Sequence, residues 1–241
     1  MTHPGSERLI VALDVESAAD ALVMARRVAR WAGTFKIGPS HVLEGGPAFI
    51  QELKALGRKV FLDLKLYDIP ETVARACRQA ARGGVDYLTV HVSGGSRMLA
   101  AARDAVRSSS SGNGRVRLLG VTVLTSFDAA QLAKEWKLQE TVEERVVLWA
   151  GLARDEALDG IVCSPLELAA LKSHLGPGML AVVPGIRSAS DPKGDQSRTM
   201  SAAEAVARGA DLIVVGRPII ASPDPERAAS EIVSQIEEGN A

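Results

Sequence analysis

Residues 60–68 read Val60-Phe-Leu-Asp-Leu-Lys-Leu-Tyr-Asp68, and Ile-Pro-Glu-Thr72 follows them directly. The stretch is apolar enough to form a buried strand, yet it carries charged residues. Side chains alternate faces along a strand, so Asp63 and Lys65 share one side with Phe61, while the leucines lie on the other side. Ionised groups inside a protein are costly unless they are paired. We therefore expect Asp63 and Lys65 to be there for a reason beyond stability.

Short apolar runs alternate with helical patterns along the whole chain. The helical segments carry capping signals, such as Ser17 with Asp20 and Ser201 with Glu204, and Pro70 suits a first helical turn. Eight such units predict an α/β protein with a (β/α)8 TIM barrel, formed by a single domain over residues 1–241, rather than an open doubly wound sheet. The expected strands are residues 9–14, 34–38, 59–65, 87–91, 116–124, 160–163, 180–184 and 211–216.

The carboxyl ends of the expected strands carry polar and charged residues, whereas their amino ends are comparatively plain. A parallel barrel is covered on both faces, and barrel active sites lie at the carboxyl ends of the strands. The sequence therefore predicts that Asp63 and Lys65 project into the barrel at a functional site. The other strand ends supply Asp14, Lys36, His91, Thr125, Ser126, Ser164, the run from Pro184 to Arg187, Gly216 and Arg217.

Composition narrows the class of protein. Hydrophobic residues make up 46% and charged residues 24% of 241 residues, which is typical of a soluble globular domain. A net charge of −1 argues against nucleic-acid binding. Cys77 and Cys163 are too few for a disulfide framework and lack the spacing of a metal site. No apolar run has the length of a membrane span or a signal peptide, so we expect a cytoplasmic protein.

Lys36, Asp63, Lys65 and Asp68 alternate in sign and form a candidate charge network. A salt-bridge network at the barrel mouth would explain them without any chemistry. Alternatively, the flanking carboxylates keep Lys65 protonated beside an anionic reaction centre. An ammonium group in that place stabilises a developing carbanion and then protonates it.

A second group of residues suits a phosphate. Gly216 and Arg217 follow the eighth expected strand, where barrels often bind phosphate, and Pro184-Gly-Ile-Arg187 ends the strand beside it. One glycine–arginine pair is a weak signal, but two adjacent strand ends favour phosphate binding. His91 is compatible with acid–base work and equally with a structural hydrogen bond.

Two polar segments resemble linkers. Residues 108–115 are rich in serine and glycine, and a boundary there would leave four strands on each side, so we expect a surface loop. Residues 187–198 lie on the predicted active face and form a candidate mobile lid.

Taken together, these motifs resemble the orotidine 5′-phosphate decarboxylase family. The match covers nearly the whole chain in order. Its segments are Leu-Asp-Val at 13–15, Phe-Lys-Ile-Gly at 35–38, Phe-Leu-Asp-Leu-Lys-Leu-Tyr-Asp-Ile-Pro-Glu-Thr at 61–72, Thr-Val-His-Val-Ser-Gly-Gly at 89–95, Val-Thr-Val-Leu-Thr-Ser at 121–126, Val-Pro-Gly-Ile-Arg at 183–187, Gly-Asp-Gln at 194–196 and Val-Gly-Arg-Pro-Ile at 215–219.

The resemblance implies a role for each site residue in the decarboxylation of orotidine 5′-monophosphate to uridine 5′-monophosphate, in pyrimidine biosynthesis. Lys65 corresponds to the lysine that protonates C6, Asp63 to the carboxylate beside the departing carboxylate, and Lys36 to its bridging partner. It also implies catalysis without a metal or organic cofactor, and a homodimer with composite sites. The remaining correspondences are Asp14 with the ribose, Asp68, Ile69 and Thr72 with the partner's site, Thr125, Ser126 and Pro184 with the substrate, and Arg187, Gln196, Gly216 and Arg217 with its phosphate.

Two rival interpretations stay open at this point. A magnesium-dependent sugar-phosphate decarboxylase or aldolase of the same barrel superfamily shares the Asp-x-Lys-x-x-Asp core, although Ile-Pro-Glu-Thr at 69–72 and Gly-Asp-Gln at 194–196 argue against it. A non-catalytic protein that binds a phosphate ligand would show binding without release of carbon dioxide.

Overall fold

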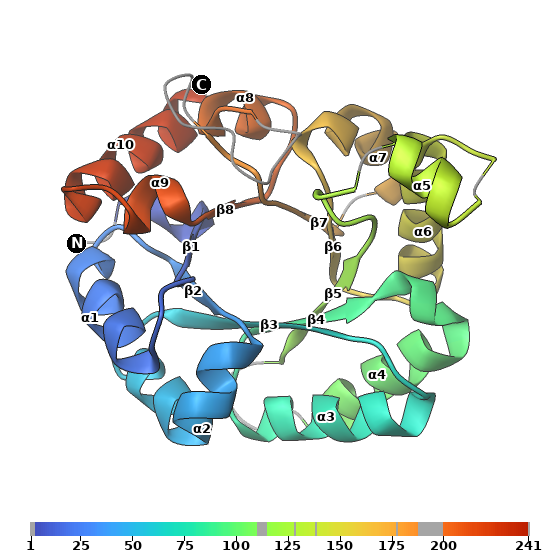
Figure 1. The fold of residues 1–241 in the computed structure, drawn as a ribbon, viewed down its shortest axis with the longest axis horizontal. Coiled ribbons are helices and arrows are strands. Elements are labelled where there is room, and N and C mark those ends of the chain that lie inside the picture. Colours follow the sequence, from blue (N-terminus) through green and yellow to red (C-terminus); the bar gives the residue numbers. More distant parts are fainter. Residues whose placement is uncertain are drawn as a thin grey trace.

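The chain forms a closed barrel of eight parallel strands in sequence order (Figure 1). The computed structural model describes residues 3–109, 115–127, 129–137, 139–176, 178–187 and 200–240. Each strand pairs with the next, and the last pairs with the first, with Ile10 opposite Val214. The predicted (β/α)8 barrel is confirmed. The strands are β1 (Leu9–Ala12), β2 (Thr34–Ile37), β3 (Lys59–Leu66), β4 (Tyr87–His91), β5 (Arg117–Val121), β6 (Gly160–Val162), β7 (Leu180–Val183) and β8 (Leu212–Val215).

Helices surround the barrel on its outside (Figure 1). Ser17 caps the first of them by accepting the Asp20 N–H at 3.0 Å, and Ser201 and Glu204 form a complete reciprocal capping box, as the sequence predicted. Pro70 occupies the first turn of its helix. The helices are α1 (Ala18–Val28), α2 (Pro39–Lys54), α3 (Pro70–Arg82), α4 (Gly95–Ser109), α5 (Ala129–Glu135), α6 (Val142–Asp155), α7 (Leu168–Leu175), α8 (Ala202–Ala207), α9 (Arg217–Ile220) and α10 (Pro225–Glu238).

Most strands are shorter at their carboxyl ends than the sequence predicted. The expected first strand reached Asp14, but β1 ends at Ala12. The residues that follow leave the ladder because the chain turns into the loop, where the Val15 N–H bonds the Leu13 carbonyl at 2.9 Å. The exceptions are β4, which has its predicted bounds, and β3, which continues one residue further to Leu66. The polar residues after the strands therefore lie on loops around the barrel mouth.

The apolar side chains form two layers separated by the barrel wall. Alternation along β3 decides which layer each residue joins: Val60 and Leu62 pack outward against the helices, whereas Phe61 points into the barrel. The inner layer also holds Ile10, Ala12, Tyr87, Leu119, Val182, Leu212 and Val214. Because this inner apolar layer fills the barrel interior, the polar side chains that project inward from the strands lie at the carboxyl ends of the strands.

The amino ends of the strands are not plain, and that prediction was wrong. One aspartate precedes each of β4, β6 and β8, and its carboxylate accepts a backbone N–H from the neighbouring strand. These bonds join Asp86 to Val60 at 2.7 Å, Asp159 to Leu118 at 2.8 Å and Asp211 to Ala181 at 2.7 Å. Each of these N–H groups belongs to the second residue of its strand, and the aspartate carboxylate satisfies it.

The two polar segments lie partly outside the described residues. The serine-rich loop was expected to begin at Ser108, but α4 continues to Ser109. Residues 110–114 lie outside the described part. Of the predicted lid, the structure describes Arg187, and residues 188–199 lie outside it. None of the described helices combines the length and apolar character needed to span a membrane.

Candidate active site

A bulge in β3 places the two charged residues of the opening motif. Leu62 is opposite Leu88 in β4, and the next matched pair is Leu66 opposite Val90. Residues 63–65 of β3 therefore face a single residue of β4. Lys65 has a φ of 48°, a left-handed conformation that costs a residue other than glycine about 1–3 kcal/mol. Bulges of this kind re-aim side chains near active sites, and here Asp63 and Lys65 both face the interior.

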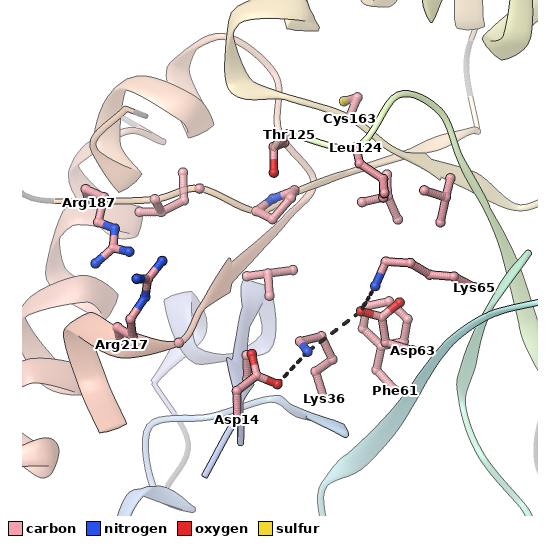
Figure 2. Close-up of a pocket in the computed structure, with 18 of the residues that line it drawn as sticks. Asp14, Lys36, Phe61, Asp63, Lys65, Leu124, Thr125, Cys163, Arg187 and Arg217 are labelled. Carbon is pink, nitrogen blue, oxygen red and sulfur yellow. Dashed lines mark hydrogen bonds and ion pairs between the residues drawn. The ribbon is translucent and has the colours of Figure 1, made fainter. Parts of the chain in front are cut away.

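Four charged side chains form a continuous chain across the barrel mouth (Figure 2). Lys65 Nζ lies 2.7 Å from Asp63 Oδ2, Lys36 Nζ lies 3.7 Å from the same oxygen, and Lys36 Nζ lies 2.9 Å from Asp14 Oδ1. The strands β1, β2 and β3 are neighbours, so adjacent strand ends supply the alternating charges. This arrangement confirms the proximity of Lys36, Asp63 and Lys65 and adds Asp14 to them.

The Asp63 carboxylate is the centre of this network. Its side chain is 11% exposed, and burial by itself would raise the pKa of its carboxyl group. The ammonium groups of Lys65 and Lys36 outweigh burial, so the pKa lies below its usual range. Asp63 is therefore an anion at neutral pH. Lys65, 38% exposed, presents its ammonium group to the cavity.

Two arginines lie across the cavity from Lys65. Figure 2 shows the guanidinium groups of Arg187, after β7, and Arg217, after β8, side by side. Arg187 is 8% exposed, and its buried Nε has no hydrogen-bond partner among the described residues. Both arginines line the same cavity, and their guanidinium groups offer several N–H donors and positive charge to one anion. The arginine pair therefore has the chemistry of a phosphate site.

The chain turn before Arg187 needs a glycine. Gly185 has a φ of 82°, which lies in the left-handed region where a side chain is strained. Pro184 precedes it and lines the cavity. This turn brings Arg187 back toward β8, where Gly216 and Arg217 follow the strand.

A cavity of about 410 Å³ separates the charge network from the arginine pair. Its wall between the two is largely apolar, and includes Phe61, Val121, Val162, Val214 and Ile186. The volume suits a small ligand with an anionic end. Thr125, after β5, also lines the cavity, and Figure 2 shows its hydroxyl turned into it.

Not every predicted site residue lines this cavity. Ser126 is exposed beside Thr125, and the exposed Asp68 uses its carboxylate to accept the Ile69 N–H at 2.6 Å instead of contacting Lys65. Ile69 and Thr72 are likewise exposed, at the start of α3. The chain turns outward after Leu66, which carries these residues away from the cavity of their own chain. Gln196 lies outside the described residues.

Sequence reasoning overlooked one direct contact of the network. Thr89 is completely buried in β4, and its hydroxyl bonds Asp63 Oδ1 at 2.9 Å. The available signal was its position, because Thr89 lies two residues after Tyr87 and therefore shares its inward face. Cys163, directly after β6, is buried and also lines the cavity.

His91 follows Thr89 on the same face of β4. Burial and the nearby Lys65 ammonium lower the pKa of His91, while Asp63 opposes the shift. The imidazole is therefore neutral at neutral pH, and its ring meets the Tyr67 ring edge-on, with centroids 6.0 Å apart. This environment fits a structural histidine better than a general acid.

The two carboxylates of the cavity, Asp14 and Asp63, are paired with lysines. Lys36 lies between Asp14 and Asp63 and forms an ion pair with each carboxylate. Within the described part of the chain, no three His, Cys, Asp or Glu side chains are grouped as a metal ion would require.

Comparison with known proteins identifies the family. The family model described as "Orotidine 5'-phosphate decarboxylase / HUMPS family" matches residues 7–232. The chain is 45% identical to the orotidine 5′-phosphate decarboxylase of Moorella thermoacetica, over 96% of this chain and 92% of the relative, and 47% identical to that of Halorhodospira halophila, over 98% of each. The crystal structure of orotidine 5′-phosphate decarboxylase from Lactobacillus acidophilus aligns with a TM-score of 0.83 and 33% identity, over 95% of this chain and 98% of that one. With its barrel, its alternating charges and its paired arginines, the chain belongs to the orotidine 5′-phosphate decarboxylase / HUMPS family.

Proposed function

We propose that this protein is a carboxy-lyase that converts orotidine 5′-monophosphate to uridine 5′-monophosphate and carbon dioxide in pyrimidine biosynthesis. The observation that carries the proposal is the Lys65 ammonium, held 2.7 Å from a buried carboxylate and facing paired arginines across a cavity. The names of the relatives at 45% and 47% identity support the same reaction.

Substrate binding would use both ends of the cavity. Arg187 and Arg217 would hold the phosphate dianion through charge-assisted hydrogen bonds, with Gly216 and Gln196 completing that end. Asp14 and Lys36 would bond the ribose hydroxyls. The pyrimidine would then lie against the apolar wall, beside Thr125, Ser126 and Pro184, with its carboxylate toward Asp63.

The chemistry follows from the charge order. A substrate carboxylate beside the Asp63 anion is destabilised by like charge, and this repulsion is relieved as neutral carbon dioxide leaves. When the bond from C6 to the carboxylate breaks, its electron pair stays on C6. The Lys65 ammonium stabilises that carbanion and donates a proton to it, and the neutral amine then regains a proton from water.

The dimer is a further part of the proposal. Tyr67 and Ile69 are large side chains beside the barrel mouth, and they are 63% and 68% exposed. A second copy that covers them would bring Asp68, Ile69 and Thr72 to the partner's cavity and add Asp68 to the Lys36–Asp63–Lys65 network.

We also infer that residues 1–241 form one domain and that the protein is cytoplasmic.

The magnesium-dependent rival makes a different prediction. Lys36 hydrogen-bonds Asp14 and forms a longer ion pair with Asp63, so an ammonium group already lies between the two carboxylates, which disfavours a cation there. Turnover that survives a chelator supports the proposed reaction, whereas activity lost to the chelator and restored by magnesium would favour the rival.

One assay tests the proposal directly. Purified protein is mixed with orotidine 5′-monophosphate, and the loss of substrate ultraviolet absorbance is followed beside the Lys65→Ala variant. Folded wild-type protein should release carbon dioxide, and the variant should not. Binding without release of carbon dioxide would instead identify a phosphate-ligand binding protein.

A further inference from the structure

The bulge in β3 leaves a gap in the backbone ladder at the centre of the site. Between its matched pairs, β3 has three residues, 63–65, and β4 has only Thr89. One residue of β4 cannot offer backbone partners to three residues of β3. The Lys65 N–H is instead bonded by a side chain, the Thr89 hydroxyl, at 2.9 Å.

The donor and acceptor roles of the Thr89 hydroxyl are determined by its two partners. A backbone N–H can only donate, so Thr89 Oγ1 accepts from Lys65. Its own proton is then free for Asp63 Oδ1, an acceptor at 2.9 Å. Thr89 is completely buried, so water does not compete for either bond. The hydroxyl thus connects the backbone of Lys65 to the side chain of Asp63.

The two carboxylate oxygens of Asp63 have different partners: Oδ1 bonds a hydroxyl, and Oδ2 faces the two ammonium groups. Oδ1 accepts from Thr89, which fixes the rotation of the carboxylate. Oδ2 is thereby turned toward Lys65 at 2.7 Å and Lys36 at 3.7 Å. The same hydroxyl stabilises the left-handed φ of 48° from which the Lys65 side chain departs.

We propose that Thr89 is a positioning residue: its hydroxyl replaces the missing backbone acceptor at the bulge and holds Asp63 and Lys65 in one fixed relative geometry. The role rests on the proposed decarboxylation, because its consequence is the rate of that reaction. Thr89 lies beneath the network and is not among the residues that line the cavity. Its loss should therefore slow the chemical step and leave substrate binding nearly unchanged.

The test compares two buried threonines in neighbouring strands. Thr89→Val keeps the shape of the side chain but removes both hydrogen bonds, and Thr89→Ser restores the hydroxyl. Thr122→Val is the matched control: Thr122 is also buried, follows β5, and donates to the Val162 carbonyl at 3.0 Å without touching the charge network. Loss of a hydrogen bond to a charged group, if it is felt fully in the transition state, lowers a rate constant by about 10- to 100-fold.

We expect Thr89→Val to lower kcat by about 10- to 100-fold with KM changed by less than about threefold. Thr89→Ser should stay within about fivefold of wild type, and Thr122→Val should lose stability without a comparable loss of kcat. Equal losses of kcat in the two valine variants, or a serine variant as slow as Thr89→Val, would overturn the positioning role. If Thr89→Val does not fold, Thr89→Cys, a weaker hydrogen-bonding group of similar size, replaces it with the same expectation.

A double-mutant cycle separates action through Asp63 from a general structural effect. In an Asp63→Asn background, the Thr89→Val substitution should reduce kcat by a much smaller factor than in wild type, because the carboxylate that it positions is gone. Fully additive losses would contradict the proposal. A wild-type protein without decarboxylase activity overturns the proposed function and this role with it, whereas active wild type with an equally active Thr89→Val overturns the role of Thr89 alone.

Discussion

Two lysine–aspartate pairs of equal length lie at opposite ends of the barrel. Lys54 and Asp86 are 2.7 Å apart at the amino end, and Lys65 and Asp63 are 2.7 Å apart at the carboxyl end. Asp86 also accepts a backbone N–H of β3, as Asp159 and Asp211 do for β5 and β7, so the amino-end pair serves the strand ladder. Asp63 instead meets two ammonium groups and a hydroxyl beside a cavity. The comparison teaches that distance alone does not separate a structural ion pair from a reactive one; the other partners of the carboxylate do.

Replacing the lysine of each pair in turn should give the largest difference in kcat between the two ends of the barrel. Lys65→Ala removes the group that we propose as the proton donor and as the charge that stabilises the carbanion, so we expect kcat to fall by at least about 10⁴-fold. Lys54→Ala should leave kcat within about twofold and lower the free energy of unfolding by no more than about 1 kcal/mol. Steady-state kinetics and chemical denaturation of both variants measure the difference. Near-normal turnover by folded Lys65→Ala would refute the assignment of the carboxyl-end pair as the reactive one.

Arginines at the two ends extend the comparison. Arg217→Ala should lower kcat/KM by about 10²-fold or more for orotidine 5′-monophosphate, because a charge-assisted phosphate contact is lost in the transition state. With orotidine, which has no phosphate, the variant should match wild type. The amino-end control is Arg8→Ala, because Arg8 bonds the carbonyls of Ala210 and Asp211 and should affect only stability. An equal loss for Arg217→Ala with both substrates would rule out a phosphate contact.

Removing an amino-end carboxylate should affect the fold alone. Asp86→Ala leaves the Val60 N–H without its partner, and we expect a loss of about 1–3 kcal/mol in the free energy of unfolding. Its kcat, measured under conditions where the protein is folded, should equal that of wild type. A large fall in kcat would show that the amino end of the barrel influences the mouth, and would contradict a purely structural role for Asp86.

Lowering the pH should reduce the stability that Asp63, the carboxyl-end aspartate, contributes to the fold. The pKa of Asp63 lies below its usual range, so the unfolded state binds more protons than the folded state at pH values between the two pKa values. The stability that Asp63 contributes is therefore present above the ordinary aspartate pKa and is lost as pH falls through the folded-state value. Unfolding titrations should show this slope in wild type and a smaller slope in Asp63→Asn. Identical slopes would indicate that Asp63 is not held as an anion by its lysines.

The sequence predicted what depends on local pattern and strand order. Apolar runs located all eight strands, alternation directed Asp63 and Lys65 inward, and the adjacency of β7 and β8 placed Arg187 beside Arg217. The bulge was not predictable, because Lys65 is not a glycine and gives no local sign of a positive φ. In that conformation the Lys65 N–H bonds Thr89, a residue 24 positions away in the sequence. The distance of Asp68 from its own cavity was equally hidden, since it depends on where the chain turns after Leu66.

Barrel closure has a consequence for the order in which the site is assembled. Asp14 follows β1 and Arg217 follows β8, and these two strands pair through three matched positions, with Leu9, Ile10 and Val11 opposite residues 213–215. After seven strands have been synthesised, the chain contains Lys36, Asp63 and Lys65 and also Arg187, which follows β7, but it does not yet contain Arg217. A nascent chain of that length therefore has one arginine of the proposed phosphate site and lacks Gly216 and the other arginine. We therefore expect the cavity to be completed only when the last strand joins the first.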